Sequence, residues 1–111
     1  MANTFKLKTF DGSSTAANAA MTVYTAPAAT TTVVLGITLA NITTSTIYAT
    51  VLIENNDGDN VNFLKGVPIP TGSSIEVMSG NKLILETSDV LKVQSDTANS
   101  LDTSLSIMEQ A

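Results

Sequence analysis

The chain has 111 residues, with ten acidic side chains against five lysines, a formal net charge of −5, and no Cys, His, Trp or Arg. These absences exclude histidine general bases, thiolate nucleophiles, disulfides and metal sites built from imidazole or thiolate. The acidic balance without arginine excludes the basic surfaces that neutralise phosphates, so we expect neither a nucleic-acid partner nor an anionic membrane as partner.

The N-terminal twenty residues are expected to form a strand or arm followed by a loop. The segment Phe5-Lys6-Leu7-Lys8-Thr9 alternates between apolar and polar residues, which predicts a strand over 4–10 with one buried face. Residues 13–20 combine alanine with Ser, Thr and Asn, whose side chains compete with helical backbone bonds. We therefore expect a loop there. The first residues lack a basic region followed by an apolar run, so we expect no signal peptide.

The run over residues 31–41 is the most continuously apolar part of the chain. After a short strand predicted over 21–25 and a break at Pro27, it predicts a central strand that is covered on both sides. Gly36 inside the run predicts a β-bulge or a close backbone approach. The expected core residues of this strand are Val33, Leu35, Ile37 and Leu39.

Six further strands are predicted, over residues 46–54, 61–66, 74–78, 82–86, 90–95 and 100–109. Pro68 is expected to end the 61–66 strand, because proline cannot donate to a ladder. Ser79-Gly80-Asn81 is expected to form a tight hairpin between its two neighbouring strands. The remaining expected core residues are Ile47, Val51, Ile53, Leu83, Leu85, Val93, Leu101, Leu105 and Ile107.

Nine short strands at roughly ten-residue spacing are typical of an all-β sandwich or barrel. We expect a single domain over residues 1–111, an antiparallel β-sandwich of the jelly-roll type, with an immunoglobulin-like sandwich as the alternative. No composition shift or linker run divides the chain.

The acidic loop over residues 55–60 holds the candidate metal ligands. Asn55, Asp57 and Asp59 offer oxygen atoms at alternate positions, which Ca²⁺ accepts. An EF-hand loop requires glycine at its sixth position and glutamate at its twelfth. Counted from Asn55, Gly58 is fourth and Gly66 is twelfth. A polar β-turn without metal is therefore the preferred interpretation, and no cofactor is expected.

No residue is expected to be catalytic. Hydroxyl groups are abundant, but the chain has no histidine to activate them. A pair of carboxylates could hydrolyse a glycoside, yet no spacing singles out a pair and a raised pKa would require burial. The acidic residues considered are Glu54, Glu76, Glu86, Asp89, Asp96, Asp102 and Glu109.

The candidate contact residues are Phe5, Lys6, Lys8, Tyr24 and Tyr48. Lys6 and Lys8 share one face of the first strand, where lysine blocks unwanted sheet extension; alternatively this strand reaches an acidic neighbouring subunit. Tyr24 and Tyr48 could stack on a sugar, although amphipathic rings of this kind more often sit half-buried at the edge of a core.

Two segments carry a resemblance to a known group of proteins. VYTAPAATTTVVLGITLAN at residues 23–41 and PIPTGSSIEVMSGNKLILETSDVLKV at residues 68–93 are similar to small virion structural proteins of tailed bacteriophages, as in phages of cyanobacteria. The likeness covers most of residues 22–107, and it is a whole-chain pattern without a catalytic motif. Related phage sandwiches often have glycine in the position of Ser88. This chain departs from them there, and the departure leaves the type of turn at this position open.

The resemblance implies a non-enzymatic β-sandwich present in many copies on a virion assembled in the host bacterial cytoplasm. It implies a capsid decoration (cement) protein, a homotrimer whose partner is the major capsid protein or another phage structural subunit. The alternative is a tail or neck accessory protein or a fibre module that contacts host-surface glycan. Fold by itself does not decide function, so these are expectations by analogy.

Overall fold

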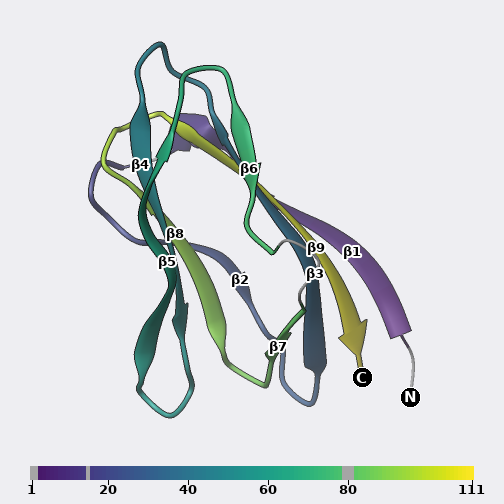
Figure 1. The fold of residues 1–111 in the computed structure, drawn as a ribbon. Coiled ribbons are helices and arrows are strands. Elements are labelled where there is room, and N and C mark those ends of the chain that lie inside the picture. The colour runs from purple at the N-terminus through teal and green to yellow at the C-terminus, as the bar shows by residue number, and fades with distance from the viewer. Residues whose placement is uncertain (1–2, 15, 79–81) are drawn as a thin grey trace.

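The computed structural model describes residues 3–14, 16–78 and 82–111. Apart from one turn of 3-10 helix, η1 (Gly12–Ser14), its regular elements are strands (Figure 1). The strands are β1 (Asn3–Phe10), β2 (Met21–Thr25), β3 (Thr31–Asn41), β4 (Ile47–Glu54), β5 (Asn60–Ile69), β6 (Ser74–Glu76), β7 (Leu83–Leu85), β8 (Val90–Ser95) and β9 (Leu101–Gln110).

The strands form two antiparallel sheets with the connectivity of a jelly roll. Sheet A has the order β1-β9-β3, with both β6 and β7 on the far edge of β3, and sheet B has the order β2-β8-β4-β5. Strands early in the chain therefore pair with late strands in reverse order: β1 with β9, β2 with β8, β3 with β6 and β7, and β4 with β5. This is one long antiparallel ribbon rolled into two layers. The predicted all-β sandwich is confirmed.

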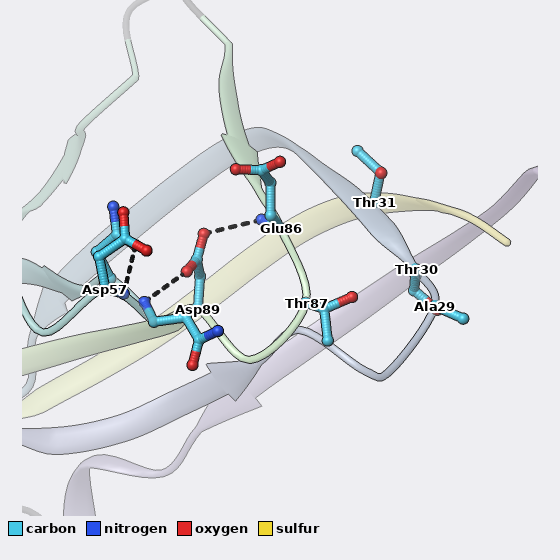
Figure 2. Close-up of a pocket in the computed structure, with 9 residues that line it drawn as sticks. Ala29, Thr30, Thr31, Asp57, Glu86, Thr87 and Asp89 are labelled. Atoms are coloured by element: carbon cyan, nitrogen blue, oxygen red, sulfur yellow. Dashed lines mark hydrogen bonds between the residues drawn. The ribbon is translucent and has the colours of Figure 1, made fainter.

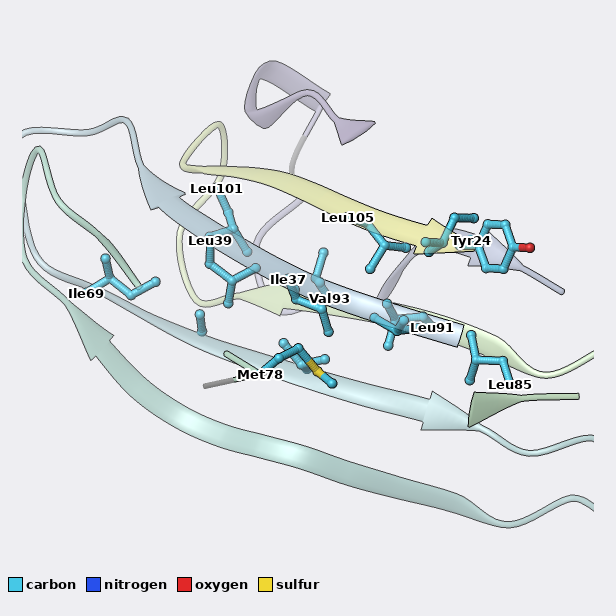
Figure 3. Packing of buried hydrophobic residues seen from close by; sticks show 14 of the residues in the cluster. Tyr24, Ile37, Leu39, Ile69, Met78, Leu85, Leu91, Val93, Leu101 and Leu105 are labelled. Atoms are coloured by element: carbon cyan, nitrogen blue, oxygen red, sulfur yellow. The ribbon is translucent and has the colours of Figure 1, made fainter. Parts of the chain in front are cut away.

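Aliphatic side chains from both sheets fill the space between them (Figure 3). Alternate residues of β9 are buried, as their period of two predicted, and Ile37 and Leu39 of β3 are fully buried. Ile53 and Leu83 are partly buried against this core. The sequence did not single out several residues that the core contains: Tyr24, Ala26, Val34, Ala49, Ile69, Met78 and Leu91.

The first half of β3 has the opposite orientation to the one predicted. Val34 is fully buried, Val33 is half-buried and Leu35 is 37% exposed. The register shifts between Val34 and Gly36, which confirms the bulge predicted at this glycine. A bulge inserts one extra residue, so the residues before it point to the opposite side from those predicted by extending the later alternation backwards. β3 lies inside sheet A, but its outer side is not covered as predicted, because the described chain forms only two layers.

β1 lies at the edge of sheet A, and none of its residues is buried. The alternation predicted one buried face, but Phe5 is 71% and Leu7 67% exposed. In the register with β9, Lys6 and Lys8 lie opposite the buried Ile107 and Leu105. The lysines are therefore on the side of sheet A that faces the interior, and the apolar residues point outward.

β5 continues further than predicted, through Pro68 to Ile69. It is the edge strand of sheet B, where a missing N–H does not interrupt pairing on the side of β4. Gly66 has a φ of 63°, in the left-handed region, and its N–H donates to the Thr50 hydroxyl at 3.1 Å. This irregularity lets the strand turn and continue.

The hairpin expected around residues 79–81 lies outside the described residues. Its two flanking strands, however, do not pair with each other as predicted. β6 pairs with residues 38–40 of β3, and β7 pairs with residues 32–34 of the same strand. They are two pieces of one interrupted strand along the edge of β3.

Candidate interaction surface

Four neighbouring strands of sheet A place an apolar residue at the same level on its outer face. Phe5 of β1 pairs with Met108 of β9, Met108 pairs with Val33 of β3, and Val33 pairs with Ile84 of β7. Directly paired residues lie on the same side of a sheet. The strand neighbours of Met108 and Val33 are buried between the sheets, so these four side chains face outward. We call them the apolar row.

The two ends of the apolar row are strongly exposed, since Phe5 and Ile84 are 71% and 60% accessible. Leu7, which pairs with Ser106 at the next level, enlarges the patch, and Leu35, the unpaired residue of the bulge, is 37% exposed. Single exposed apolar side chains are normal on proteins, whereas a contiguous patch marks a surface that binds something. The continuous apolar run around Val33 also indicates a partner. Such a run is typical of a strand that is covered on both faces.

The described strand residues in the half of this outer face that carries the apolar row include no charged side chain. Among the described residues in the strands of sheet A, those with ionisable side chains on the outer face are Glu76 and Asp102. They pair with Thr38 and Ala40, which lie five and seven residues beyond Val33 along β3. The apolar row therefore brings no charge of its own into a contact.

A hollow of about 410 Å³ lies on the same sheet, at the other end of the strands. Its carboxylates are already bonded: Asp102 Oδ1 accepts from the Gly12 N–H at 2.6 Å, and Asp11 Oδ1 accepts from the Ser13 N–H at 2.9 Å. The bond from Ser13 holds the pKa of Asp11 below its usual range. We call this feature the hollow, and its lining residues are Thr9, Phe10, Asp11, Thr38, Ala40, Asp102, Thr103 and Ser104.

Tyr24, a predicted contact residue, is buried and joins the two sheets. Its hydroxyl donates to Glu109 Oε2 at 2.5 Å and lies 2.8 Å from the Thr32 hydroxyl, and Glu109 Oε1 lies 2.8 Å from Lys6 Nζ. Burial, followed by the bond to Glu109, raises the pKa of Tyr24 to about 12. The bonds from Lys6 and then Tyr24 lower the pKa of Glu109. Lys6 thus anchors β1 to a network that sequence did not reveal.

The other predicted contact residues lie on different surfaces. Phe5 belongs to the apolar row. Lys8 is half-buried on the same side of β1 as Lys6. Tyr48 is 50% exposed on the outer face of sheet B, where it pairs with Pro68. The structure therefore does not bring these candidates together at one site.

The candidate metal ligands lie in the β4–β5 loop, beside a polar hollow of about 440 Å³ at one end of the sandwich (Figure 2). Asn55 Oδ1 accepts from the Asp57 N–H at 3.0 Å, and the Asn55 N–H donates to the Asp59 carbonyl at 2.8 Å. Within residues 3–14, 16–78 and 82–111, no group of three or more His, Cys, Asp or Glu residues could hold a metal ion. These contacts are those of a polar turn.

Asp89 is the buried carboxylate at this end of the molecule. It accepts from the Asn56 N–H at 2.8 Å through Oδ1 and from the Glu86 N–H at 2.9 Å through Oδ2 (Figure 2). Its backbone carbonyl also accepts from the Ala26 N–H. Asp89 therefore holds three loops together, which explains its burial without a catalytic role.

Glu76 is a second carboxylate with a structural task. It fills the gap between β6 and β7, where Oε1 accepts from the N–H groups of Ile37 at 3.0 Å and Met78 at 3.2 Å, and Oε2 accepts from the Thr38 hydroxyl at 3.0 Å. Burial raises the pKa of Glu76, but these three bonds outweigh it and the net pKa is lowered. Gly36 lies beside this carboxylate, where a Cβ would make an ordinary contact at 3.7 Å, so the glycine did not mark the role of Glu76 in the sequence.

No protein-family model and no curated protein match the chain. Among solved structures, the chain is similar to a subunit of Bacillus endospore appendages, which are disulfide-linked pili, with a TM-score of 0.54 and 14% identity over 97% of this chain and 84% of that one. The structure of infectious bursal disease virus strain Gx has a TM-score of 0.47 and 11% identity over 95% of this chain and 32% of that one.

These similarities concern the fold alone, given the low identities. The present chain has no cysteine, so the disulfide linkage of the Bacillus pili is not available to it. Among the described residues, no helix is long and apolar enough to span a membrane.

Proposed function

We propose that this protein is a non-enzymatic structural subunit that works by adhering to other subunits of an assembly. The observation that carries this proposal is the apolar row, an exposed and uncharged patch across four strands of sheet A. A side of a sheet that is apolar but uncovered in the single chain is stabilised when a partner removes it from water. The titratable groups support the same proposal, because Glu76, Asp89 and Glu109 are engaged in bonds that hold the fold.

The specific assembly that we propose is the virion of a tailed bacteriophage, assembled in the host cytoplasm. The resemblance of residues 23–41 and 68–93 to phage virion proteins, described in the sequence analysis, motivates this choice, and the jelly-roll fold is one that viral capsid domains use. In its most specific form the protein decorates the capsid as a homotrimer that contacts the major capsid protein.

The test is binding of the full chain to purified particles and to their isolated subunits. We expect the protein to cosediment with particles, and we expect Phe5→Ser with Ile84→Ser to weaken binding at least tenfold. Val61→Ser on β5 is a matched control, because Val61 is an apolar side chain that is 53% exposed on the other sheet. A wild-type protein that stays monomeric and binds neither particles nor their subunits would contradict the proposal.

A second candidate function is a tail, neck or fibre module that contacts host-surface glycan. The observation in its favour is the half-exposed ring of Tyr48 on the outer face of sheet B, because aromatic rings stack on sugars. We expect Tyr48→Ala to abolish such binding and Tyr48→Phe to retain it. An array on which the native protein binds no glycan would remove this candidate. Tyr24 does not enter this test because it is buried.

A further inference from the structure

The outer face of sheet A carries a protruding feature and a recessed feature at matched positions. Along β1, Phe5 of the apolar row lies four residues from Thr9 of the hollow, and along β9, Met108 lies four residues from Ser104. At about 3.4 Å per residue, both separations are roughly 14 Å. The midpoints, Leu7 and Ser106, pair with each other across the two strands.

From this geometry we propose that the face binds the same face of a second copy of the chain around a two-fold axis. The axis lies in the plane of contact, perpendicular to the strands, and passes over Leu7 and Ser106. Rotation about it exchanges the apolar row and the hollow, so that the apolar row of each copy covers the hollow of the other. The inference rests on the proposed function, since it names a second copy as the partner of the same surface, and it replaces the homotrimer by a two-fold dimer.

Shape is the first reason for a second copy as the occupant. Phe5, which is 71% exposed, comes over Thr9 of the partner subunit, and Met108 comes over Ser104 of the partner subunit. Each contact occurs twice, as an isologous interface requires. Leu7, which is 67% exposed, meets Leu7 of the partner subunit at the axis. The apolar row of one copy therefore fits the hollow of an identical copy.

Charge is the second reason. Two copies with a net charge of −5 repel each other, so a stable contact must keep their carboxylates apart. The rotation brings Asp102 opposite Gln110 of the partner subunit, because these residues lie four positions on either side of Ser106. It brings Glu76 opposite Ile84 of the partner subunit, while the Glu76 carboxylate is already bonded to β3. No two like charges on the described outer-face strands meet.

The available area is sufficient. A standard interface removes about 800 Å² from each partner, which is roughly a seventh of the 5715 Å² surface of this chain. Sheet A forms one broad side of a molecule whose extents are 45 × 26 × 23 Å. Two such faces would stack about 10 Å apart, as packed sheets do. The pair is closed, so it does not propagate into a fibre.

Cysteine cross-linking tests the axis directly, because the chain contains no cysteine. We expect a short bis-maleimide reagent, which spans the roughly 10 Å between packed sheets, to link Leu7→Cys into a dimer. Phe5→Cys combined with Thr9→Cys should be linked between chains in the same way, since the two positions face each other across the contact but are roughly 14 Å apart within one chain. Val61→Cys on sheet B is the control and should remain monomeric on a denaturing gel.

Sedimentation equilibrium of the full chain measures the association itself. We expect Phe5→Ser, Ile84→Ser and the hollow-filling Ser104→Trp each to raise the dimer dissociation constant at least tenfold, and Val61→Ser to leave it within twofold. All four positions are exposed or half-exposed, so these variants should keep the β-sheet circular dichroism of the parent. A wild-type monomer or trimer without cross-linking at Leu7 would overturn the proposal.

Particle binding separates this inference from the proposed function. A monomer that still cosediments with particles would overturn the two-fold contact and leave the structural role supported. A cross-linked dimer that binds no particle or subunit would support the contact and overturn the role on the virion.

Discussion

Glu109 controls the edge at which the N-terminal strand meets the core. Its two carboxylate oxygens are divided between Lys6 on β1 and Tyr24 on β2, so one side chain links the edges of both sheets. Hydrogen bonds to a charged acceptor are about twice as strong as those between neutral groups, and the site is largely removed from water. The same bonds lower the pKa of Glu109, and burial followed by the bond to Glu109 raises the pKa of Tyr24.

The lowered pKa of Glu109 predicts a loss of stability in acid. A carboxylate whose pKa is depressed by folding contributes stability above its unfolded pKa of about 4.3, and this contribution is lost as the pH falls through the lower folded value. We expect Glu109→Gln to lower the free energy of unfolding at pH 7 by about 1–3 kcal/mol. Its further loss between pH 5 and pH 3 should be smaller than that of the wild type.

Urea denaturation at pH 7, 5, 4 and 3 measures this difference. Glu86→Gln is the control, since Glu86 is an exposed carboxylate, and it should keep the acid dependence of the wild type. Equal acid slopes for Glu109→Gln and the wild type would show that this network does not set the acid stability.

Ala29 provides a second prediction at this scale, because it has a φ of 54° in the left-handed region. This conformation costs an L-residue about 1–2 kcal/mol, while glycine adopts it freely. We expect Ala29→Gly to raise the free energy of unfolding by about 0.5–1 kcal/mol. Ala28→Gly, at the adjacent exposed position in the same turn, should lower it by a similar amount. Thermal denaturation of both variants tests this prediction of opposite effects. A loss of stability in both variants would contradict it.

The interrupted strand beside β3 illustrates how a side chain can replace a missing segment of backbone. β6 and β7 together pair with only six residues of β3, and the Glu76 carboxylate takes the Ile37 N–H between them. The bulge at Gly36 lies beside this carboxylate. Without this acceptor, the Ile37 N–H would face the gap between β6 and β7 without a partner.

Removal of this carboxylate should loosen β3 locally. We expect Glu76→Ala to lower the free energy of unfolding by about 1–2 kcal/mol and to increase hydrogen exchange at the Ile37 and Met78 amides. Glu76→Gln keeps one carbonyl acceptor and should show an intermediate effect. Exchange measured residue by residue is the test, with Glu86→Ala as the control. Unchanged protection of Ile37 in Glu76→Ala would refute the role.

At the scale of the whole molecule, the jelly roll leaves the outer side of sheet A without a cover. Its first and last strands are neighbours, as Asn3 pairs with Gln110, so most contacts join residues that are far apart in sequence. Such non-local pairing is typical of domains that fold in milliseconds to seconds. The edge strand β1 has no buried residue and gains its burial only if a partner covers Phe5 and Leu7.

This arrangement predicts that stability depends on protein concentration. A partner that binds only the folded state stabilises it by about 2.7 kcal/mol at a hundred times its dissociation constant. We expect the thermal midpoint of the wild type to rise by several degrees between low and high micromolar concentration. Phe5→Ser combined with Ile84→Ser should abolish this rise, and Val61→Ser should retain it. Differential scanning calorimetry at three concentrations is sufficient, and a constant midpoint in the wild type would argue against association.

The alternation of side chains along the chain determined where the strands lie and that the protein is a sandwich. The predicted ranges 21–25, 31–41 and 90–95 coincide with β2, β3 and β8, because apolar runs and the turn residues that bound them are local properties of the sequence. The bulge at Gly36 was also visible locally. Composition alone excluded thiolate and imidazole chemistry, because a chain without histidine and cysteine cannot supply either group in any fold.

Only the tertiary structure decided which side of each strand is buried and which side chains meet. Val33 and Leu35 were assigned to the core because the alternation was carried through the bulge unchanged, although one inserted residue reverses it. The meeting of Tyr24, Glu109 and Lys6, and the alignment of Phe5 with Ile84 across four strands, depend on pairings between distant segments. No local pattern specifies such pairings, because they follow from how the whole ribbon rolls up.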